Sequence, residues 1–379
     1  MRIAVIGAGI AGLVAAASLQ LDGHDVTVYE QREEPNADGA GLTLFGNAFA
    51  ALDAVGLGDT VRDISDNTLP TLRTGQRTAD GTWLTTIPTQ TVGQLHSVHR
   101  VTLHETLLCL LTPGTVRTVA PALVDPTGSG RVELVNTSET FDLVLAADGL
   151  RSRNRQQLGL DAGIRYSGYT AWRGVTQPGS VDLAGAAAET WGSGSIFGIV
   201  PLPEDRMYWF GTLNQPAGTT FLDEHAAAAE AFAGWHHPIP EAIAVTAPEA
   251  VIRHDIYDLD KLPKPFGRGR TVLLGDAAHA MLPNLGQGAG QGIEDAVTLT
   301  LLLRKMTRKP LHEILARYSV LRRRRTATLW RQSRLMAQVA QASGSTTTRL
   351  RNRGMQLLPA SLIGSVSQRF HRWEPPYRR

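Results

Sequence analysis

The hydrophobic pattern of the first 30 residues alternates between strand and helix. Residues 2–6 form a short apolar run, residues 10–22 follow as a helix, and residues 25–30 form a second strand-like run. A strand, a helix and a second strand in this order open a βαβ unit. Strand-like runs at residues 141–147 and 271–275 return the chain to the same context later in the sequence.

The pattern changes between about residue 164 and residue 214. Aromatic and β-branched residues dominate this stretch and are separated by glycine and proline, which predicts a mostly antiparallel sheet. Residues 195–201 and 206–213, joined by a turn at 203–205, predict a hairpin. Helices are predicted over residues 47–55, 97–111, 221–233, 286–303 and 310–342.

These elements predict an α/β fold with a sheet inserted into a Rossmann-like domain. The nucleotide-binding domain is expected to be discontinuous and to comprise residues 1–163 and 265–342. The mostly antiparallel sheet domain is expected at residues 164–264, and a helical, basic tail at residues 343–379. The sequence shows no internal repeat and no low-complexity linker, so these boundaries follow topology alone.

Composition agrees with a globular enzyme of 379 residues, of which 42% are hydrophobic and 19% are charged. Cys109 is the only cysteine, which excludes an internal disulfide and a thiolate zinc cluster and favours the cytoplasm. No apolar run reaches the roughly 18 residues that a membrane span needs, so no transmembrane segment is predicted.

Charge is distributed unevenly along the chain. Residues 304–379 hold eighteen lysines and arginines against two acids, Glu313 and Glu374. A basic segment of this kind can bind nucleic acid or an anionic membrane. Apolar residues recur through it at helical spacing, which favours a cationic helix packed on the acidic remainder of the chain. We therefore expect no nucleic-acid partner and interpret Arg322–Arg325 as a solvated or ion-paired face.

The turn between the first strand and the first helix carries a dinucleotide fingerprint. Gly7 permits a tight turn, Gly9 lets backbone approach a pyrophosphate, and Gly12 lets helix and strand pack closely. Glu30 ends the second strand, where its carboxylate can accept hydrogen bonds from adenosine ribose hydroxyls. The fingerprint alone does not separate FAD from NAD, because both contain the same ADP half.

Two later motifs make that distinction. Residues 146–155 (AADGLRSRNR) contain an Asp-Gly pair, and residues 275–279 (GDAAH) precede Pro283 and the glycine-rich run 286–296 (GQGAGQGIEDA). In this order, and with the N-terminal fingerprint, they resemble the FAD motifs of class A flavin monooxygenases, the family typified by para-hydroxybenzoate hydroxylase. A glycine-rich loop that opens a helix also offers backbone N–H groups to negative charge.

The resemblance implies a set of FAD-binding residues over nearly the whole chain: Gly7, Gly9, Ala11, Gly12, Glu30, Arg32, Gly41, Arg100, Asp148, Asp276, Pro283, Gly286, Gly288, Ala289 and Gly290. Arg100 is expected to reach the FAD, and Asp276 to bind a ribityl hydroxyl. Many relatives have asparagine at the position of Gly290, so backbone contacts would replace a side-chain contact to the flavin ring here.

The resemblance also implies the chemistry. NAD(P)H, used transiently, would reduce a tightly bound FAD, dioxygen would add to form a flavin hydroperoxide, and its distal oxygen would hydroxylate or epoxidise a small organic substrate. The protein would exclude water and position the reactants. The alternatives are an FAD oxidase or dehydrogenase of the same fold, a non-catalytic flavin-binding protein, and a plain NAD(P) dehydrogenase. The protein is expected to be a monomer or a homodimer.

Period-two alternation in the hairpin suggests a substrate pocket, although the sequence leaves open which face turns toward the flavin. One face carries Ile196, Tyr208 and Phe210, and we prefer it, together with Pro283, as the pocket lining. Either face is largely apolar, which favours an aromatic or polycyclic substrate. Arg173 is expected to pair with a local carboxylate rather than bind an acidic group.

Histidine spacing indicates no metal site. His279 is expected to pack or to form a hydrogen bond.

Overall fold

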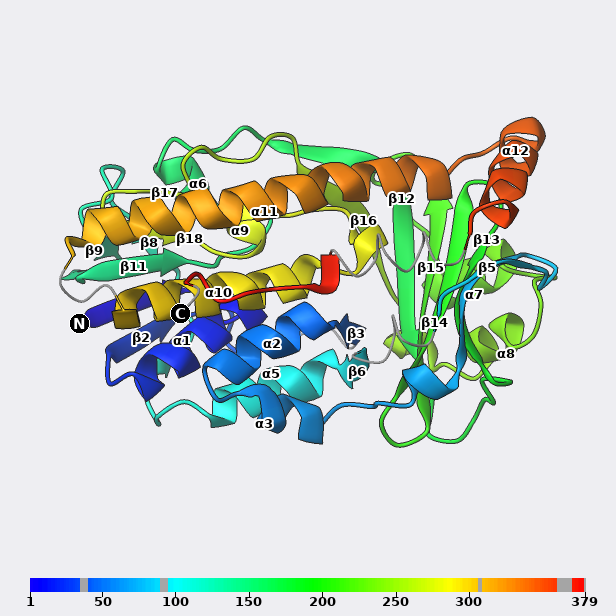
Figure 1. The fold of residues 1–379 in the computed structure, drawn as a ribbon, viewed down its shortest axis with the longest axis horizontal. Coiled ribbons are helices and arrows are strands. Elements are labelled where there is room, and N and C mark those ends of the chain that lie inside the picture. Colours follow the sequence, from blue (N-terminus) through cyan, green and yellow to red (C-terminus); the bar gives the residue numbers. More distant parts are fainter. Residues whose placement is uncertain (35–39, 89–94, 306–308, 360–369, 378–379) are drawn as a thin grey trace.

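The structure, a computed structural model, describes residues 1–34, 40–88, 95–305, 309–359 and 370–377. Two β-sheets lie at opposite ends of an elongated molecule, with helices packed around the first sheet and one long helix running toward the second (Figure 1). The predicted α/β fold with an additional, mostly antiparallel sheet is confirmed.

The first sheet has six strands in the order β17-β18-β11-β1-β2-β7, and only β17 runs antiparallel to its neighbour. Its strands are β1 (Arg2–Ile6), β2 (Asp25–Tyr29), β7 (Val116–Arg117), β11 (Leu143–Ala146), β17 (Gly267–Arg268) and β18 (Thr271–Leu273). The central strands are buried on both faces, which explains why they read as continuous apolar runs.

Helices cover both faces of this sheet and supply nearly half of the buried residues of the large core cluster. They are α1 (Ile10–Leu21), α2 (Gly46–Ala54), α3 (Gly58–Asp63), α5 (Arg100–Cys109), α6 (Arg153–Gln157), α9 (Asp276–His279), α10 (Gly288–Lys305) and α11 (Leu311–Ala340). A strand pair, β3 (Gly41–Leu44) with β6 (His96–His99), and a small sheet of β8 (Leu123–Val124), β9 (Arg131–Glu133) and β10 (Ser138–Thr140) complete this part.

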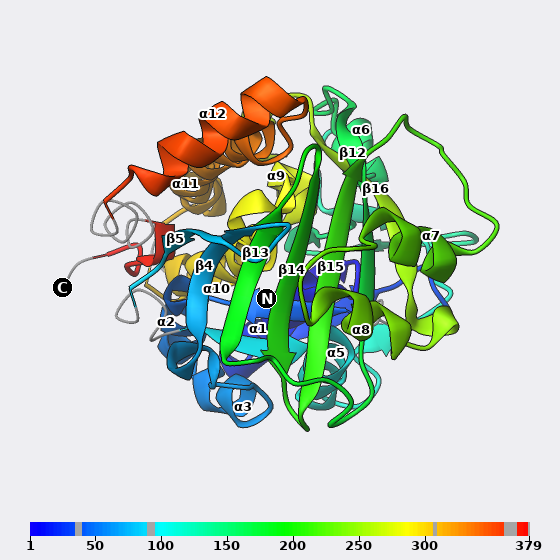
Figure 2. The same cartoon turned by 90° about the vertical axis from the view of Figure 1, so that its right-hand side faces the viewer.

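The second sheet has seven strands in the order β16-β12-β15-β14-β13-β4-β5. They are β4 (Arg73–Thr78), β5 (Trp83–Thr86), β12 (Ile164–Val175), β13 (Ala186–Trp191), β14 (Ser195–Leu202), β15 (Arg206–Asn214) and β16 (Ile252–Leu259). The hairpin predicted from residues 195–213 is β14–β15. Helices α7 (Glu224–Ala231) and α8 (Ile239–Ala244) cover the outer face (Figure 2).

Two strands of the second sheet come from an unexpected part of the chain. The sequence-based boundary assigns residues 73–86 to the nucleotide-binding domain, whereas the structure adds them to the second sheet as β4 and β5. Strand β4 pairs in parallel with β13, more than one hundred residues later in the chain. Its residues, RTGQRT, show no apolar alternation, so only the long-range pairing reveals where the strand belongs.

Helix α11 connects the two ends of the molecule, and α12 (Ser345–Gln356) lies beside the second sheet (Figures 1 and 2). Three 3₁₀ turns occur at Leu69–Thr71, Pro248–Ala250 and Pro283–Leu285, the last of which is η3. In the part of the chain that the structure describes, no helix is both long and apolar enough to cross a membrane.

Candidate functional site

The three fingerprint glycines occupy different environments. Gly7 has a φ of 105°, and a Cβ placed there would lie 2.5 Å from the carbonyl oxygen of Ala147. A Cβ on Gly12 would lie 2.1 Å from the carbonyl oxygen of Gly7, whereas one on Gly9 would meet nothing within 4 Å. Gly7 and Gly12 therefore allow close packing, and Gly9 presents bare backbone to open space at the start of α1.

This open space is a cavity of about 330 Å³ at the carboxyl ends of β1 and β2. Several of the residues predicted to bind FAD contribute to its lining: Gly7, Gly9, Glu30, Arg32, Arg100 and Asp148. The structure thus gathers residues that are as far as 141 positions apart around one cavity at the helix N-terminus. Their contacts with FAD remain predictions.

Two side chains fix the β1–α1 turn from opposite sides. Glu30 accepts a hydrogen bond from the backbone N–H of Ala8 at 2.9 Å, and His104 lies 2.7 Å from the carbonyl oxygen of Ala8. The second carboxylate oxygen of Glu30 accepts from the backbone N–H of Arg32 at 2.9 Å. Glu30 therefore holds both loops that border the cavity, a role that the sequence did not indicate.

Asp148 organises the loop that follows β11. Its carboxylate accepts hydrogen bonds from the Ser152 hydroxyl at 2.6 Å and from the Asn154 side chain at 2.9 Å. Arg155 is buried and donates to the carbonyl oxygens of Leu150 and Ala277, at 2.9 and 3.1 Å. The Asp-Gly loop is thereby joined to α9, which begins with Asp276, the carboxylate of the second FAD motif.

The second motif packs directly against the first. Gly275 has a φ of 58°, and a Cβ there would lie 3.1 Å from Cβ of Ala11. A Cβ on Gly292 of α10 would lie 2.9 Å from the same atom. Ala11 thus contacts both glycines, so its predicted place beside the cofactor coincides with a packing role. Asp276 follows Gly275, and its side chain is exposed, with no hydrogen bond to any described residue.

The loop from Pro283 to Gly290 leaves backbone accessible at the start of α10. Gly286 has a φ of 62° and lies against Phe45, whereas a Cβ on Gly288 would meet nothing within 4 Å. Gly288 and Ala289 form the first turn of α10, whose unpaired N–H groups attract negative charge. Gly290 is buried, and a Cβ there would lie 3.3 Å from the Asn47 amide nitrogen.

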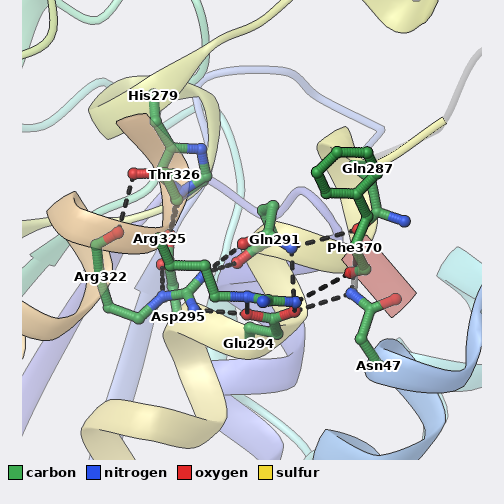
Figure 3. Close-up of polar contacts among 11 residues, drawn as sticks. Asn47, His279, Gln287, Gln291, Glu294, Asp295, Arg322, Arg325, Thr326 and Phe370 are labelled. Atoms are coloured by element: carbon green, nitrogen blue, oxygen red, sulfur yellow. Dashed lines mark hydrogen bonds and ion pairs between the residues drawn. The ribbon is translucent and has the colours of Figure 1, made fainter. Parts of the chain in front are cut away.

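A buried polar network lies behind this loop (Figure 3). Nε2 of His279 is 2.5 Å from Oδ2 of Asp295, and the same oxygen accepts from the backbone N–H of Gly275 at 2.8 Å. The prediction that His279 forms a hydrogen bond is confirmed. Asp295 therefore ties the start of α9 to α10, the two helices that carry the second FAD motif.

Arg322 of α11 completes the network. It donates to Oδ1 of Asp295 at 2.5 Å and to the carbonyl oxygen of Gln291 at 3.0 Å, and it pairs with Glu294. Burial acts to raise the pKa of Asp295, but the charges of His279 and Arg322 outweigh it and hold that pKa below its usual value. Asp295 therefore stays ionised, and removal of one of its partners would leave a buried charge uncompensated.

The same network reaches the loop itself. Asn47 of α2 donates to Glu294 at 2.7 Å and to the side-chain oxygen of Gln287 at 3.0 Å. Arg325 also donates to Glu294, at 2.7 Å. The expected ion-paired face of Arg322–Arg325 is thus real for two arginines, but Arg322 is buried inside the protein. Apolar periodicity could not reveal this, because the partners lie on another helix.

The inner face of the second sheet turns toward the FAD motifs. We define it by Tyr169 and Arg173 of β12, Glu189 and Trp191 of β13, Ile196 and Gly198 of β14, and Tyr208 and Phe210 of β15. A Cβ on Gly41 would lie 2.4 Å from Tyr208, and Tyr169 donates to Asn284 of η3 at 2.8 Å. Pro283, which precedes Asn284, is exposed.

The preferred hairpin face is this inner face, and its role as the lining of the substrate pocket stays a prediction. Ile196, Tyr208 and Phe210 lie on the inner face, whereas Phe197 and Trp209 pack under α7 and α8 on the outer face. Sequence analysis missed Glu189, although period-two alternation along residues 186–191 places it on the same face as Trp191, which donates to it at 2.9 Å. Arg100 joins the two regions, because it lines the cavity and its charge partly opposes the burial that raises the pKa of Tyr208.

These features fit FAD. Bare backbone at Gly9 and Gly288, the cavity beside Glu30 and Arg100, and the exposed carboxylate of Asp276 provide complementary groups for a pyrophosphate, an adenosine and a ribityl chain. Among the described residues, no cluster of three His, Cys, Asp or Glu side chains is arranged to hold a metal ion.

Comparison with known proteins agrees with this assignment. The FAD binding domain family matches residues 1–333. The chain is 31% identical to an aurachin C monooxygenase/isomerase from Stigmatella aurantiaca, over 99% of each chain. It is also 31% identical to a 2-heptyl-3-hydroxy-4(1H)-quinolone synthase from Pseudomonas aeruginosa, over 97% of each chain.

A solved structure shows the same fold around the cofactor. The Klebsiella pneumoniae protein HpxO, whose crystal structure contains FAD and uric acid, superposes with a TM-score of 0.88 at 26% identity. The superposition covers 98% of this chain and 96% of that one. The chain therefore belongs to the FAD-binding family of class A flavin monooxygenases, and it is an FAD-dependent monooxygenase of small aromatic or heterocyclic molecules.

Proposed function

We propose that the substrate is a bicyclic heteroaromatic molecule of the 4-quinolone type, which lies against the inner face of the second sheet. The observation that carries the proposal is the position of the Phe210 ring on this face. A Cβ on Gly198 would lie 2.2 Å from the Phe210 ring, so the ring covers the glycine and offers its open side to a planar ligand. One relative of nearly equal length is named as a 2-heptyl-3-hydroxy-4(1H)-quinolone synthase.

Tyr208 supplies a polar group beside the Phe210 ring. Its ring centroid lies 6.1 Å from that of Phe210. Burial raises the pKa of its hydroxyl, and although Arg173 and Arg100 oppose this effect, the pKa stays above its usual value. Tyr208 therefore remains protonated at neutral pH and can donate a hydrogen bond to a ring carbonyl of the substrate.

FAD, when bound, supplies the redox chemistry: NADH or NADPH provides two electrons, and one oxygen atom of O₂ enters the substrate while the other leaves as water. The protein positions the ring and limits the access of water. Trp209 and Phe197, both 0% exposed, cover the outer side of the sheet and exclude water from it. Arg100, which lines the cavity, and the exposed carboxylate of Asp276 would hold the cofactor.

The test is substrate-stimulated turnover of the FAD-loaded enzyme. NAD(P)H oxidation, H₂O₂ release and ¹⁸O incorporation from ¹⁸O₂ are measured with 2-heptyl-4-quinolone, urate and 4-hydroxybenzoate. We expect the quinolone to stimulate NAD(P)H oxidation most, with ¹⁸O in the product and little peroxide. Stimulation by urate or 4-hydroxybenzoate alone would contradict the proposed substrate class. Oxidation of the quinolone without ¹⁸O would indicate an oxidase.

We also propose that the enzyme works in the cytoplasm as a monomer or a homodimer. The single cysteine, Cys109, is exposed and free, which suits a reducing compartment. Light scattering after size-exclusion chromatography tests the oligomeric state, and a larger assembly would contradict the proposal.

A further inference from the structure

Arg173 stands at one end of a row of four residues that crosses the inner face. Strand register pairs Arg173 with Phe210, Phe210 with Gly198, and Gly198 with Glu189. Residues paired across neighbouring strands project to the same face of a sheet. The row therefore has a cation, Arg173, at one end and an acid, Glu189, at the other, with the Phe210 ring between them.

Among the described residues, Arg173 has no carboxylate partner, unlike Arg165 on the same strand and Arg253 on the neighbouring strand β16. Arg165 pairs with Asp258 at 3.3 Å, and Arg253 pairs with Glu224 at 2.9 Å. Arg173 is half-buried, and the described residues supply no Asp or Glu oxygen within ion-pair distance of it. The expectation that Arg173 pairs with a local carboxylate is therefore wrong for the described residues.

Glu189 does not serve as a distant counter-ion. Three strand spacings separate it from Arg173, a distance of about 14 Å between backbones. Burial raises the pKa of Glu189, with only a partial opposing effect from Trp191. Burial therefore favours the neutral form of Glu189. A half-buried guanidinium without a nearby anion is unfavourable unless a ligand supplies one.

The position of Arg173 relates it to the FAD loop. Its charge opposes the burial that raises the pKa of both Tyr208 and Tyr169, so it acts on both hydroxyls. Tyr169 donates to Asn284 of η3, which lies between Pro283 and Gly286. The guanidinium consequently belongs to the part of the inner face that turns toward the second FAD motif.

We propose that Arg173 determines substrate specificity by binding an oxygen substituent that carries negative charge on the aromatic ring. The inference rests on the proposed function in one respect, namely that the ring lies on Phe210. A planar guanidinium can donate two parallel hydrogen bonds to such an oxygen or carboxylate, and partial burial strengthens them. In a 4-quinolone the corresponding atom is the C4 oxygen, on which conjugation with the ring nitrogen places negative charge.

The experiment compares two ligands of equal shape, 2-naphthoate and 2-naphthamide, on the full-length FAD-loaded enzyme. Dissociation constants are measured by titration of the flavin absorbance. We expect the wild-type enzyme to prefer the carboxylate by about tenfold or more, which is about 1.4 kcal/mol. Arg173→Gln removes this preference and changes the naphthamide constant less than about twofold, while Arg173→Lys retains part of it.

The control is Arg324→Gln, which removes the same charge from an exposed position on α11 and should leave the preference unchanged. FAD content and melting temperature show whether each variant is folded. The inference is overturned if Arg173→Gln still prefers the carboxylate. It is also overturned if the variant loses affinity equally for the carboxylate and the amide, because that result indicates a packing role for Arg173.

The two proposals fail in different ways. A carboxylate preference that depends on Arg173, without oxygenation of any quinolone, overturns the proposed substrate class and supports the anion subsite. Quinolone oxygenation with unchanged kcat and KM in Arg173→Gln supports the substrate class and overturns the role of Arg173.

Discussion

The two faces of the hairpin β14–β15 carry similar aromatic side chains in different surroundings. On the outer face, Phe197 and Trp209 stack with ring centroids 5.4 Å apart, and Phe232 packs edge-on against Phe197. On the inner face, Tyr208 and Phe210 lie between Glu189 and Arg173, and Arg173 has no carboxylate partner among the described residues. The outer face therefore stabilises the sheet, and the inner face is available for recognition.

The largest expected effect comes from the outer face. Trp209→Ala removes a fully buried ring together with its hydrogen bond to Thr246, at 2.9 Å. We expect a loss of about 3–5 kcal/mol in the free energy of unfolding. Urea denaturation at fixed FAD concentration measures it. A loss below about 1 kcal/mol would show that the outer face is not the principal stabilising one.

A smaller effect is expected where the inner face meets β3. Gly41→Ala would place a Cβ 2.4 Å from Tyr208, so that Tyr208 or the strand must shift. We expect a loss of about 1–3 kcal/mol in stability and weaker substrate binding. Gly354→Ala in α12 is the matched control, because its added Cβ meets nothing within 4 Å, and it should not destabilise the protein.

Phe210→Ala should separate recognition from stability. Because the Phe210 ring is half-buried, we expect its removal to lower the free energy of unfolding by less than about 2 kcal/mol. We expect KM to rise about tenfold and peroxide release to increase, because the substrate loses its contact with this ring. Steady-state kinetics with peroxide detection measures both. Phe197→Ala on the outer face is the comparison: if it changes KM and not stability, the assignment of the two faces is reversed.

The smallest effect concerns the acid of the inner face. Because burial raises the pKa of Glu189 in the folded protein, the folded state binds this proton more tightly than the unfolded state. The resulting stability is present below the unfolded-state pKa and is lost as pH rises through the folded-state pKa. Glu189→Gln should therefore be more stable than wild type at pH 8, with a difference that shrinks toward pH 4.5.

Urea unfolding at several pH values measures that difference. Glu133→Gln, at an exposed position on β9, serves as the control and should show little dependence of this kind. A constant difference between wild type and Glu189→Gln over the whole pH range would mean that Glu189 does not titrate there.

Local patterns were sufficient for the FAD-binding elements. The β1–α1 turn needs glycine at Gly7, where φ is positive, and at Gly12, where a Cβ would strike the backbone of Gly7; these are local steric requirements, so the sequence displays them. Alternation along residues 206–213 likewise separated Tyr208 and Phe210 from Trp209. It could not decide which set faces the cofactor, because α7 and α8, which cover the other set, follow later in the chain.

The sequence by itself determined the fold class, the cofactor and the glycine-rich turns of the FAD motifs, because such turns and strand alternation are encoded by neighbouring residues. Only the tertiary structure placed β4 and β5 in the second sheet, buried Arg322 between Glu294 and Asp295, and set Arg173 and Glu189 at opposite ends of one row. Each of these depends on pairing between segments far apart in the chain, where burial and charge are decided by partners that no local pattern names.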